Sequence, residues 1–249
     1  KMTYLKIAIQ KSGRLNEDSL HLLKECGISI NNGADQLMAQ ASNFPLEVLY
    51  LRNSDIPQYV RDGVADVAIL GENTEIEKRT GNRRVLPLGF SRCRVSMAVP
   101  RDVPYEGLSY FQGKKIATSY PNTLSDFLKR EGIQAEIHEI SGSVEIAPGI
   151  GLAHAIFDIV SSGSTLFKNG LKEVYKVLDS QAVLLANPDL SPEKQALLDQ
   201  LVFRIKAVLT ARNCKYILLN APEASLEKIC SRLPGMKGPA IIPLRDKGW

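Results

Sequence analysis

The chain has 249 residues, of which 44% are hydrophobic and 23% are charged, and its formal net charge at pH 7 is +4. This length allows one large domain or two modest ones, and the composition is typical of a globular protein in water. The small, scattered positive charge suits anionic small molecules but argues against a nucleic-acid-binding protein. The sequence contains no run of about 18 apolar residues, so no membrane span is predicted.

The N-terminal residues and the cysteines favour a cytoplasmic protein. The first residues, KMTYLKIAIQ, lead directly into a predicted strand and lack the apolar region of a signal peptide. The cysteines form no CxxC pair, so we expect free thiols instead of disulfides or a metal site. They are Cys26, Cys93, Cys214 and Cys230. The histidines show no metal-ligand spacing either, and we assign no metal ligands to the protein.

The N-terminal part of the chain alternates short apolar runs with amphipathic ones, which is typical of α/β architecture. Asn16 is predicted to cap a helix that reaches about Cys26 and ends at Gly27. Residues 72–84 are polar and charged and predict a loop or hairpin. The predicted strands are 5–9, 46–51 and 64–70, with a short helix at 54–62.

The same alternation continues through the second part of the chain. A helix is expected at 124–130, ending at Gly132, and a looser one from Ser143, interrupted by glycines. Ser191 caps a helix with Pro192 at its first position, and the apolar face of that helix is expected to be core. The predicted strands are 94–99, 115–118, 135–140, 155–160, 173–178 and 182–186.

The last residues predict a strand at 215–221, a helix at 222–233 and a strand at 239–244. Such a β-α-β fragment is expected to be an incomplete small domain.

Two similar segments indicate an internal duplication of architecture. GVADVA at 63–68 and GLAHAI at 151–156 both follow a predicted helix and lead into a strand. We therefore expect two α/β lobes that face one another across a cleft.

The predicted strand 155–160 ends abruptly in Ser161, Ser162, Gly163, Ser164 and Thr165. A strand that stops at hydroxyl residues and glycine leaves backbone N–H groups close together, and such a concavity suits a phosphate. Asp158 is an acceptor that suits sugar hydroxyls or water on Mg²⁺. The segment thus favours a phosphorylated sugar as ligand, with an ordinary Ser/Gly turn as the alternative.

Three further segments carry groups that suit anions. Lys11, Gly13 and Arg14 lie in a strand-to-helix loop, where a helix N-terminus adds to the two cations. Arg92 and Arg94 alternate along a strand, so both guanidiniums are expected on one face. The loop 118–123, with Ser119 and Tyr120, precedes a helix. Solvated surface charge is the alternative for the cations, and Glu145 is either a capping carboxylate or a ribose ligand.

These segments occur together and in this order in the ATP phosphoribosyltransferases, and the chain resembles the long form of that family from end to end. The resemblance is carried by KIAIQKSGRL, DIPQYVRDGVADVAILGEN, LGFSRCRVSMAVP, GKKIATSYPN and residues 145–166. In the last of these, Glu145, Gly151, Asp158, Ser162-Gly163, Thr165 and Leu166 fill the places of the family motif.

The resemblance implies a reaction and an architecture. A 5-phosphoribosyl group would pass from PRPP to N1 of ATP, with Mg²⁺ present and pyrophosphate released, as the first step of histidine biosynthesis. The fold would be α/β, with two lobes of the type II periplasmic-binding-protein kind. The first lobe would comprise residues 1–92 and 180–214, the second 93–179. Residues 215–249 would begin a ferredoxin-like regulatory domain, where histidine binds as inhibitor, and the long form implies dimers and hexamers.

The resemblance also suggests roles for single residues. Ser161 to Thr165 would bind the 5-phosphate of PRPP, and Asp158 and Glu145 its ribose hydroxyls or metal-bound water. The residues that would bind phosphates and ATP are Lys11, Gly13, Arg14, Arg94, Ser119 and Tyr120. The chain departs from the family at His154, where Asp is usual, and we expect His154 near the PRPP site.

Two non-enzymatic alternatives share the expected fold. A solute-binding protein should carry a signal peptide, and a ligand-sensing domain of a transcription regulator should carry a helix-turn-helix. Neither feature is predicted from this sequence, and fold by itself does not determine function.

Overall fold

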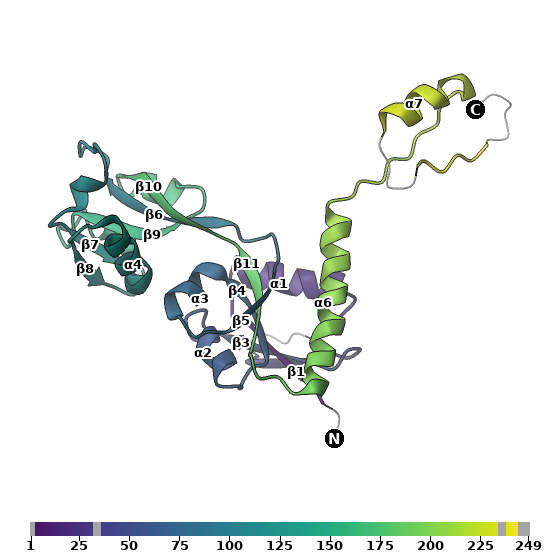
Figure 1. Cartoon of the computed structure of the whole chain (residues 1–249), viewed down its shortest axis with the longest axis horizontal. Helices are drawn as coiled ribbons and strands as arrows, with labels where there is room; N and C mark the ends of the chain where they lie inside the picture. Colours follow the sequence, from purple (N-terminus) through teal and green to yellow (C-terminus); the bar gives the residue numbers. More distant parts are fainter. Residues whose placement is uncertain (1–2, 32–35, 234–237, 244–249) are drawn as a thin grey trace. The chain divides into compact units, whose positions relative to one another are not determined.

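The computed structural model describes residues 3–31, 36–233 and 238–243. The chain divides into two units, residues 1–209 and 210–249. The first unit contains two mixed sheets and the helices that cover them (Figure 1).

The first sheet has six strands in the order β2-β3-β1-β4-β11-β5. Its centre is parallel, with β1 between β3 and β4, while β2, β11 and β5 run antiparallel to their neighbours. The strands are β1 Leu5–Gln10, β2 Met38–Gln40, β3 Leu46–Leu51, β4 Val67–Gly71, β5 Arg83–Pro87 and β11 Ala182–Ala186.

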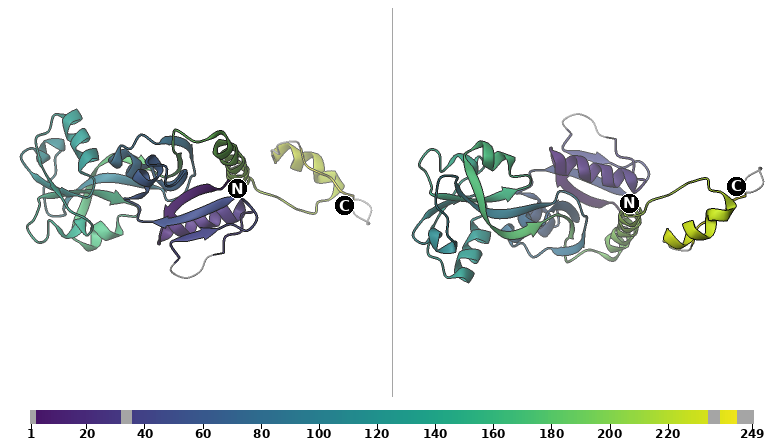
Figure 2. Two further views of the ribbon diagram at one scale, coloured as in Figure 1. Left: turned by 90° about the horizontal axis from the view of Figure 1, so that it is seen from below. Right: turned by 90° about the horizontal axis from the view of Figure 1, so that it is seen from above.

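Helices cover both faces of the first sheet because its central strands are apolar on both sides. Helices α1 (Arg14–Glu25) and α6 (Pro192–Arg212) pack on one face, as Figures 1 and 2 show. Helix α2 (Ile56–Arg61) packs on the other. The apolar face predicted for α6 is confirmed as core, since Leu198, Leu201 and Ile205 are buried.

The second sheet has five strands in the order β10-β6-β9-β7-β8. The strands are β6 Cys93–Pro100, β7 Lys115–Thr118, β8 Glu136–Glu139, β9 Ala155–Val160 and β10 Leu171–Ser180. Helix α4 (Pro121–Glu131) buries Leu124, Phe127 and Leu128 against one face. The other face is covered by Val144 and by Leu166 of the short helix α5 (Ser164–Lys168).

Three predictions of local structure in the first unit are wrong. Residues 72–84 form helix α3 (Glu72–Lys78) and the start of β5, because acidic residues in its first turn and Lys78 in its last favour a helix. Helix α1 begins before Asn16, whose side-chain amide instead donates to the Gln10 carbonyl. After Ser143 only a 3₁₀ turn forms, at Val144–Ile146.

The second unit contains the 3₁₀ turn Glu223–Ser225, which is followed in the chain by helix α7 (Leu226–Arg232). The strand predicted at 215–221 is not formed, and neither is the described part, 239–243, of the strand predicted at 239–244. A strand needs a neighbour for its backbone groups and a surface for its side chains. Tyr216 and Leu218 are 89% and 82% exposed, so residues 215–221 have no such surface here.

All four cysteines lie in the described part of the chain, and none of them forms a disulfide. In the described ranges of the chain, no helix combines the length and apolar character needed to cross a membrane.

Candidate active site

The turn at 161–165 follows β9, which is central in the second sheet, between β6 and β7. Gly163 has φ +78°, a left-handed conformation that favours glycine, and α5 starts at the next residue. The hydroxyls of Ser162 and Ser164 lie 2.9 Å apart. Within the described part of the chain, no acceptor pairs with the backbone N–H of Gly163 or Thr165. The predicted turn is therefore present, with exposed donors.

Asp158 lies on β9 just before this turn. Burial raises the pKa of its carboxyl to about 6, a donation from the Ile159 N–H (2.8 Å) partly opposes this shift, and the charge of Glu145 adds to it. The fold thus brings the two predicted carboxylates close enough to interact. A half-buried carboxylate with a raised pKa, next to a second carboxylate, is typical of functional sites.

Tyr120 adds a partly buried phenol to this cluster. Burial and the nearby charge of Asp158 raise its pKa well above the usual value, so the phenol keeps its proton. Ser119 has a structural role, because its hydroxyl donates to the Ile140 carbonyl (2.6 Å) and accepts from the Gly142 N–H (3.4 Å). Of the two predicted residues, Tyr120 lies beside Asp158, whereas Ser119 supports the loop that leads to Glu145.

Arg94 lies on β6 next to the turn, but its guanidinium is already engaged. It donates to both carboxylate oxygens of Glu173 (2.6 and 2.5 Å) and to the Ser161 carbonyl (3.1 Å). Arg94 therefore holds the start of the turn in place. The predicted pair of guanidiniums on one strand face is wrong, since Arg92 precedes β6 and donates to the Gly89 carbonyl.

His154 immediately precedes β9, at the opposite end of the strand from the turn at 161–165. Its imidazole Nδ1 accepts a hydrogen bond from the backbone N–H of Lys115 (3.1 Å), and its backbone N–H donates to the Lys115 carbonyl (2.8 Å). Asp66 makes the same two contacts with Lys6 in the first sheet (2.8 and 2.9 Å). The duplicated motif therefore fixes where two parallel strands begin, and His154 lies away from the turn that is predicted to bind PRPP.

We accordingly predict that His154→Asp leaves steady-state kinetics within about twofold of wild type, because a carboxylate accepts the same N–H. His154→Leu removes the acceptor and should lower the free energy of unfolding by about 1 kcal/mol. Kinetics and denaturant unfolding of both variants check this. A large change in the KM of either substrate in His154→Asp would contradict it.

Lys11, Gly13 and Arg14 lie where β1 passes into α1. Gly13 has φ +86° and is the N-cap residue of this helix. The side chain of Arg14 is 84% exposed, with one long contact to Asp18 (3.9 Å). The backbone N–H of Lys11 donates to the Leu51 carbonyl (2.8 Å). The two cations belong to the first sheet, whereas the turn at 161–165 belongs to the second.

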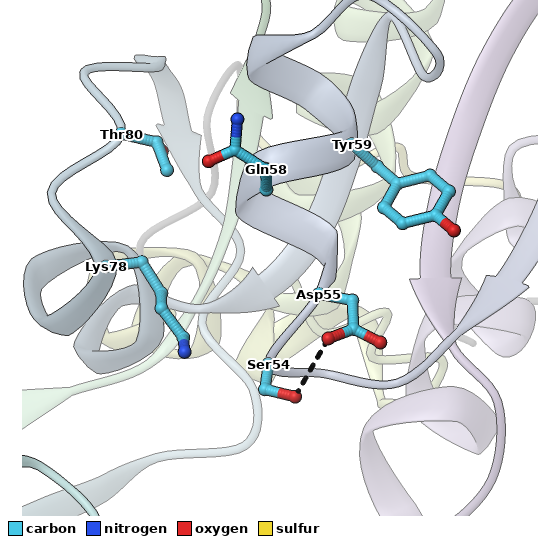
Figure 3. Close-up of a pocket in the computed structure, with 6 residues that line it drawn as sticks. All are labelled: Ser54, Asp55, Gln58, Tyr59, Lys78 and Thr80. Carbon is cyan, nitrogen blue, oxygen red and sulfur yellow. Dashed lines mark hydrogen bonds between the residues drawn. The ribbon is translucent and has the colours of Figure 1, made fainter.

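Two of the cavities formed by the described residues lie away from the turn. One of about 330 Å³ lies between α2 and α3, and Figure 3 shows its six lining residues: Ser54, Asp55, Gln58, Tyr59, Lys78 and Thr80. The other, of about 510 Å³, lies where the chain passes between the two sheets. Cys93 lines the second cavity, and burial raises the pKa of its thiol.

Comparison with protein families gives an independent assignment. Residues 52–207 match the model of ATP phosphoribosyltransferase, and residues 211–249 match the model of its C-terminal domain. The chain belongs to the ATP phosphoribosyltransferase family. The predicted family, the enzyme class and the first step of histidine biosynthesis are thereby confirmed.

Curated relatives agree with this assignment. The ATP phosphoribosyltransferase of Cytophaga hutchinsonii is 57% identical over 99% of this chain and 86% of its own length. That of Bacteroides thetaiotaomicron is 56% identical over 98% of this chain and 87% of its own.

Solved structures confirm the fold. The ATP phosphoribosyl transferase (HisG:HisZ) complex from Thermotoga maritima superposes with TM-score 0.72 at 26% identity, over 83% of this chain and 99% of that one. The substrate binding protein of an amino acid ABC transporter gives TM-score 0.55 at 12% identity, over 84% and 94%. This second likeness shows the predicted two-lobed fold alone, and the family match favours the phosphoribosyltransferase over the solute-binding alternative.

Two residues beside the candidate site of this phosphoribosyltransferase, Glu173 and Glu77, were not predicted from the sequence. Glu173 holds Arg94 and accepts from the Ser96 hydroxyl (2.7 Å), and the alternation of β10 could have indicated it. Glu77 contacts the start of α4 and lies in the segment interpreted as a loop. The acidic first turn of α3 was the available signal for that helix.

Proposed function

We propose that the turn at 161–165 binds the 5-phosphate of PRPP and that Asp158 and Glu145 hold its ribose hydroxyls. The observation that carries this proposal is the group of exposed, unpaired donors directly beyond a carboxylate of raised pKa. Backbone N–H groups and hydroxyls suit a phosphate, and carboxylates suit sugar hydroxyls. Both features lie at the carboxyl end of a strand, where open α/β sheets bind ligands.

In the proposed reaction, N1 of ATP attacks C1 of the ribose as the bond from C1 to the pyrophosphate oxygen breaks. The bonding electrons leave with pyrophosphate, and C1 passes through a state with oxocarbenium character. Asp158 and Glu145 place negative charge near this developing positive charge. The remaining task of the protein is to align two bound substrates and exclude water.

The cations of the first sheet are proposed to bind phosphates of ATP. Lys11 and Arg14, with Gly13 between them, have exposed charged ends available for this role. Tyr120, as a protonated phenol beside Asp158, is proposed as a donor to substrate. Arg94 and Ser119 are proposed to position the turn and the Glu145 loop and not to bind ATP directly.

Mg²⁺ is proposed to arrive with the substrate phosphates. Across the described ranges, no three His, Cys, Asp or Glu side chains form a group able to hold a metal ion. Asp158 and Glu145 fit an ion that keeps its waters and phosphate ligands, since Mg²⁺ is commonly bound through one or two carboxylates plus phosphate. The ion would supply neutralisation of the pyrophosphate charge.

The remaining expectations stay as proposals. We assign residues 1–92 with 180–214 to the first catalytic lobe, 93–179 to the second, and 215–249 to part of a regulatory domain. The match of residues 211–249 to the family's C-terminal domain supports histidine as inhibitor of the intact enzyme. A cytoplasmic homo-oligomer is the form we propose.

This proposal is tested by whether Thr165→Ala changes the KM for PRPP but not the KM for ATP. Losing one hydrogen bond to a charged phosphate costs about 1.5–3 kcal/mol, so the KM for PRPP should rise about 10-fold to 100-fold. The KM for ATP should stay within about twofold. Formation of N1-phosphoribosyl-ATP from ATP, PRPP and Mg²⁺ provides the assay. An equal rise in both KM values would place the turn outside the PRPP site.

A further inference from the structure

The first turn of α4, which covers the second sheet, is capped by a residue of α3, a helix beside the first sheet. Glu77 of α3 accepts hydrogen bonds from the Asn122 N–H (2.9 Å), the Thr123 N–H (2.8 Å) and the Thr123 hydroxyl (2.7 Å). The Glu77 side chain belongs to a residue that is only 6% exposed. A carboxylate thus crosses from the lobe of the first sheet into the lobe of the second.

This contact replaces the local cap that α4 lacks. The N-cap residue of α4, Tyr120, makes no side-chain cap bond, and Pro121 has no N–H to satisfy. The N–H groups of Asn122 and Thr123 are the ones that normally donate a hydrogen bond to an N-cap side chain, and here both donate to Glu77. The positive end of the helix dipole also favours a carboxylate there. The N-terminus of α4, which the sequence predicted to suit a substrate anion, is therefore occupied by the Glu77 carboxylate.

Further contacts surround Glu77. The Asn122 amide donates to the Glu77 carbonyl (3.0 Å), and Arg79 donates to Asp126 (2.5 Å) and to the Asn122 carbonyl (3.0 Å). We call these five residues, Glu77, Arg79, Asn122, Thr123 and Asp126, the interlobe latch. The Arg79–Asp126 pair is exposed and contributes little, whereas the Glu77 bonds are buried.

The latch leads directly to the candidate active site. Tyr120 immediately precedes α4, and the charges of Asp158 and Glu77 both act on its phenol. A movement of α4 away from α3 would therefore carry Tyr120, the neighbour of Asp158, away from the first lobe and its cations.

We propose that Glu77 is a positioning residue, which holds the two lobes in the arrangement that binds both substrates. This inference rests on the proposed function of Asp158 and the turn at 161–165. It assigns no contact with substrate to Glu77. Glu77 instead determines the fraction of enzyme molecules that are competent to bind substrate. The apparent dissociation constant equals the intrinsic one divided by this fraction, so a smaller fraction weakens the apparent affinity.

The decisive variant is Glu77→Gln, which replaces one acceptor oxygen by a donor facing N–H groups. The KM for PRPP should rise about tenfold, while kcat at saturation stays within about twofold, because bound substrates restore the closed arrangement. Thr123→Val removes only the hydroxyl donor and should raise the KM about threefold. It provides a milder variant in case Glu77→Gln does not fold.

Glu75→Gln is the matched control. Glu75 lies on the same helix and accepts from the Thr80 hydroxyl (2.7 Å) and the Asn82 N–H (3.2 Å), all within the first lobe. Its kinetics should follow wild type even if its melting temperature falls. A purely structural role for Glu77 would instead give the same kinetics in both variants.

Small-angle X-ray scattering of the full chain without substrate tests the latch separately from the chemistry. Glu77→Gln should have a larger radius of gyration than wild type, returning to the wild-type value with saturating ATP, PRPP and Mg²⁺, and Glu75→Gln should not. An unchanged radius together with an unchanged KM would overturn the inference, as would a fall in kcat with no change in KM. Failure of the proposed function would show instead in Thr165→Ala, with the substrate-free scattering difference intact.

Discussion

Asp158→Asn is expected to lower kcat/KM for PRPP by about 10²–10³-fold at pH 8. The substitution keeps the size of the side chain but removes the charge that we place beside the ribose. Electrostatic groups aimed at developing charge have effects of this order. Turnover to N1-phosphoribosyl-ATP, measured at several PRPP concentrations, gives the value.

The same variant should gain relative stability at high pH. Burial raises the folded-state pKa of Asp158 from 3.8 to about 6, so between these pH values the folded state binds more protons than the unfolded state. The contribution of this group is therefore full below about pH 4 and is lost as the pH rises through 6, a difference of about 3 kcal/mol. Asp158→Asn should lack this loss in denaturant unfolding.

A carboxylate outside the cluster provides the control for both effects. Asp179 pairs with Lys176 at the surface (2.7 Å), and Asp179→Asn should change neither turnover nor the pH dependence of stability appreciably. If Asp158→Asn retained wild-type turnover, Asp158 would have no part in the reaction.

The second large effect is on the pH dependence of activity. Below about pH 6 the Asp158 carboxyl is protonated and loses its charge, so kcat/KM should fall about tenfold for each further pH unit. A phosphate monoester on the substrate also titrates near pH 6. The quantity to measure is therefore the ratio of wild type to Asp158→Asn between pH 5 and 8, in which the titration of the substrate cancels.

Glu145 supplies an internal check of the cause. Its negative charge raises the pKa of Asp158, so Glu145→Gln should shift the midpoint of this ratio to lower pH. A ratio that stays constant from pH 5 to 8 would contradict the assignment of the titration to Asp158.

The sequence predicted the parts of this molecule that depend on local pattern. The buried strand 155–160 and its turn were predictable because an apolar run ends in hydroxyl residues and glycine. The duplication at Asp66 and His154 was also predictable, although its meaning was not. Only the backbone partners Lys6 and Lys115 show that these side chains fix where strands begin.

Contacts between segments far apart in the chain were beyond such patterns. The partners of Arg94 and Ser119, Glu173 and the Ile140 carbonyl, come from distant segments, so these contacts could not be derived from the segments around Arg94 and Ser119. The polar composition of residues 72–84 concealed α3 and with it Glu77. At 215–221 the apolar pattern predicted a strand, but a strand forms only with a pairing partner.

The role of the turn at 161–165 is tested most directly by comparing PRPP with an analogue that lacks the 5-phosphate. Dissociation constants are measured calorimetrically for both ligands, with wild type and with Thr165→Ala. Wild type is expected to bind PRPP at least about tenfold more tightly than the analogue. Thr165→Ala should lose most of this preference while binding the analogue as wild type does. Equal weakening of both ligands by Thr165→Ala would show that the turn at 161–165 does not bind the 5-phosphate.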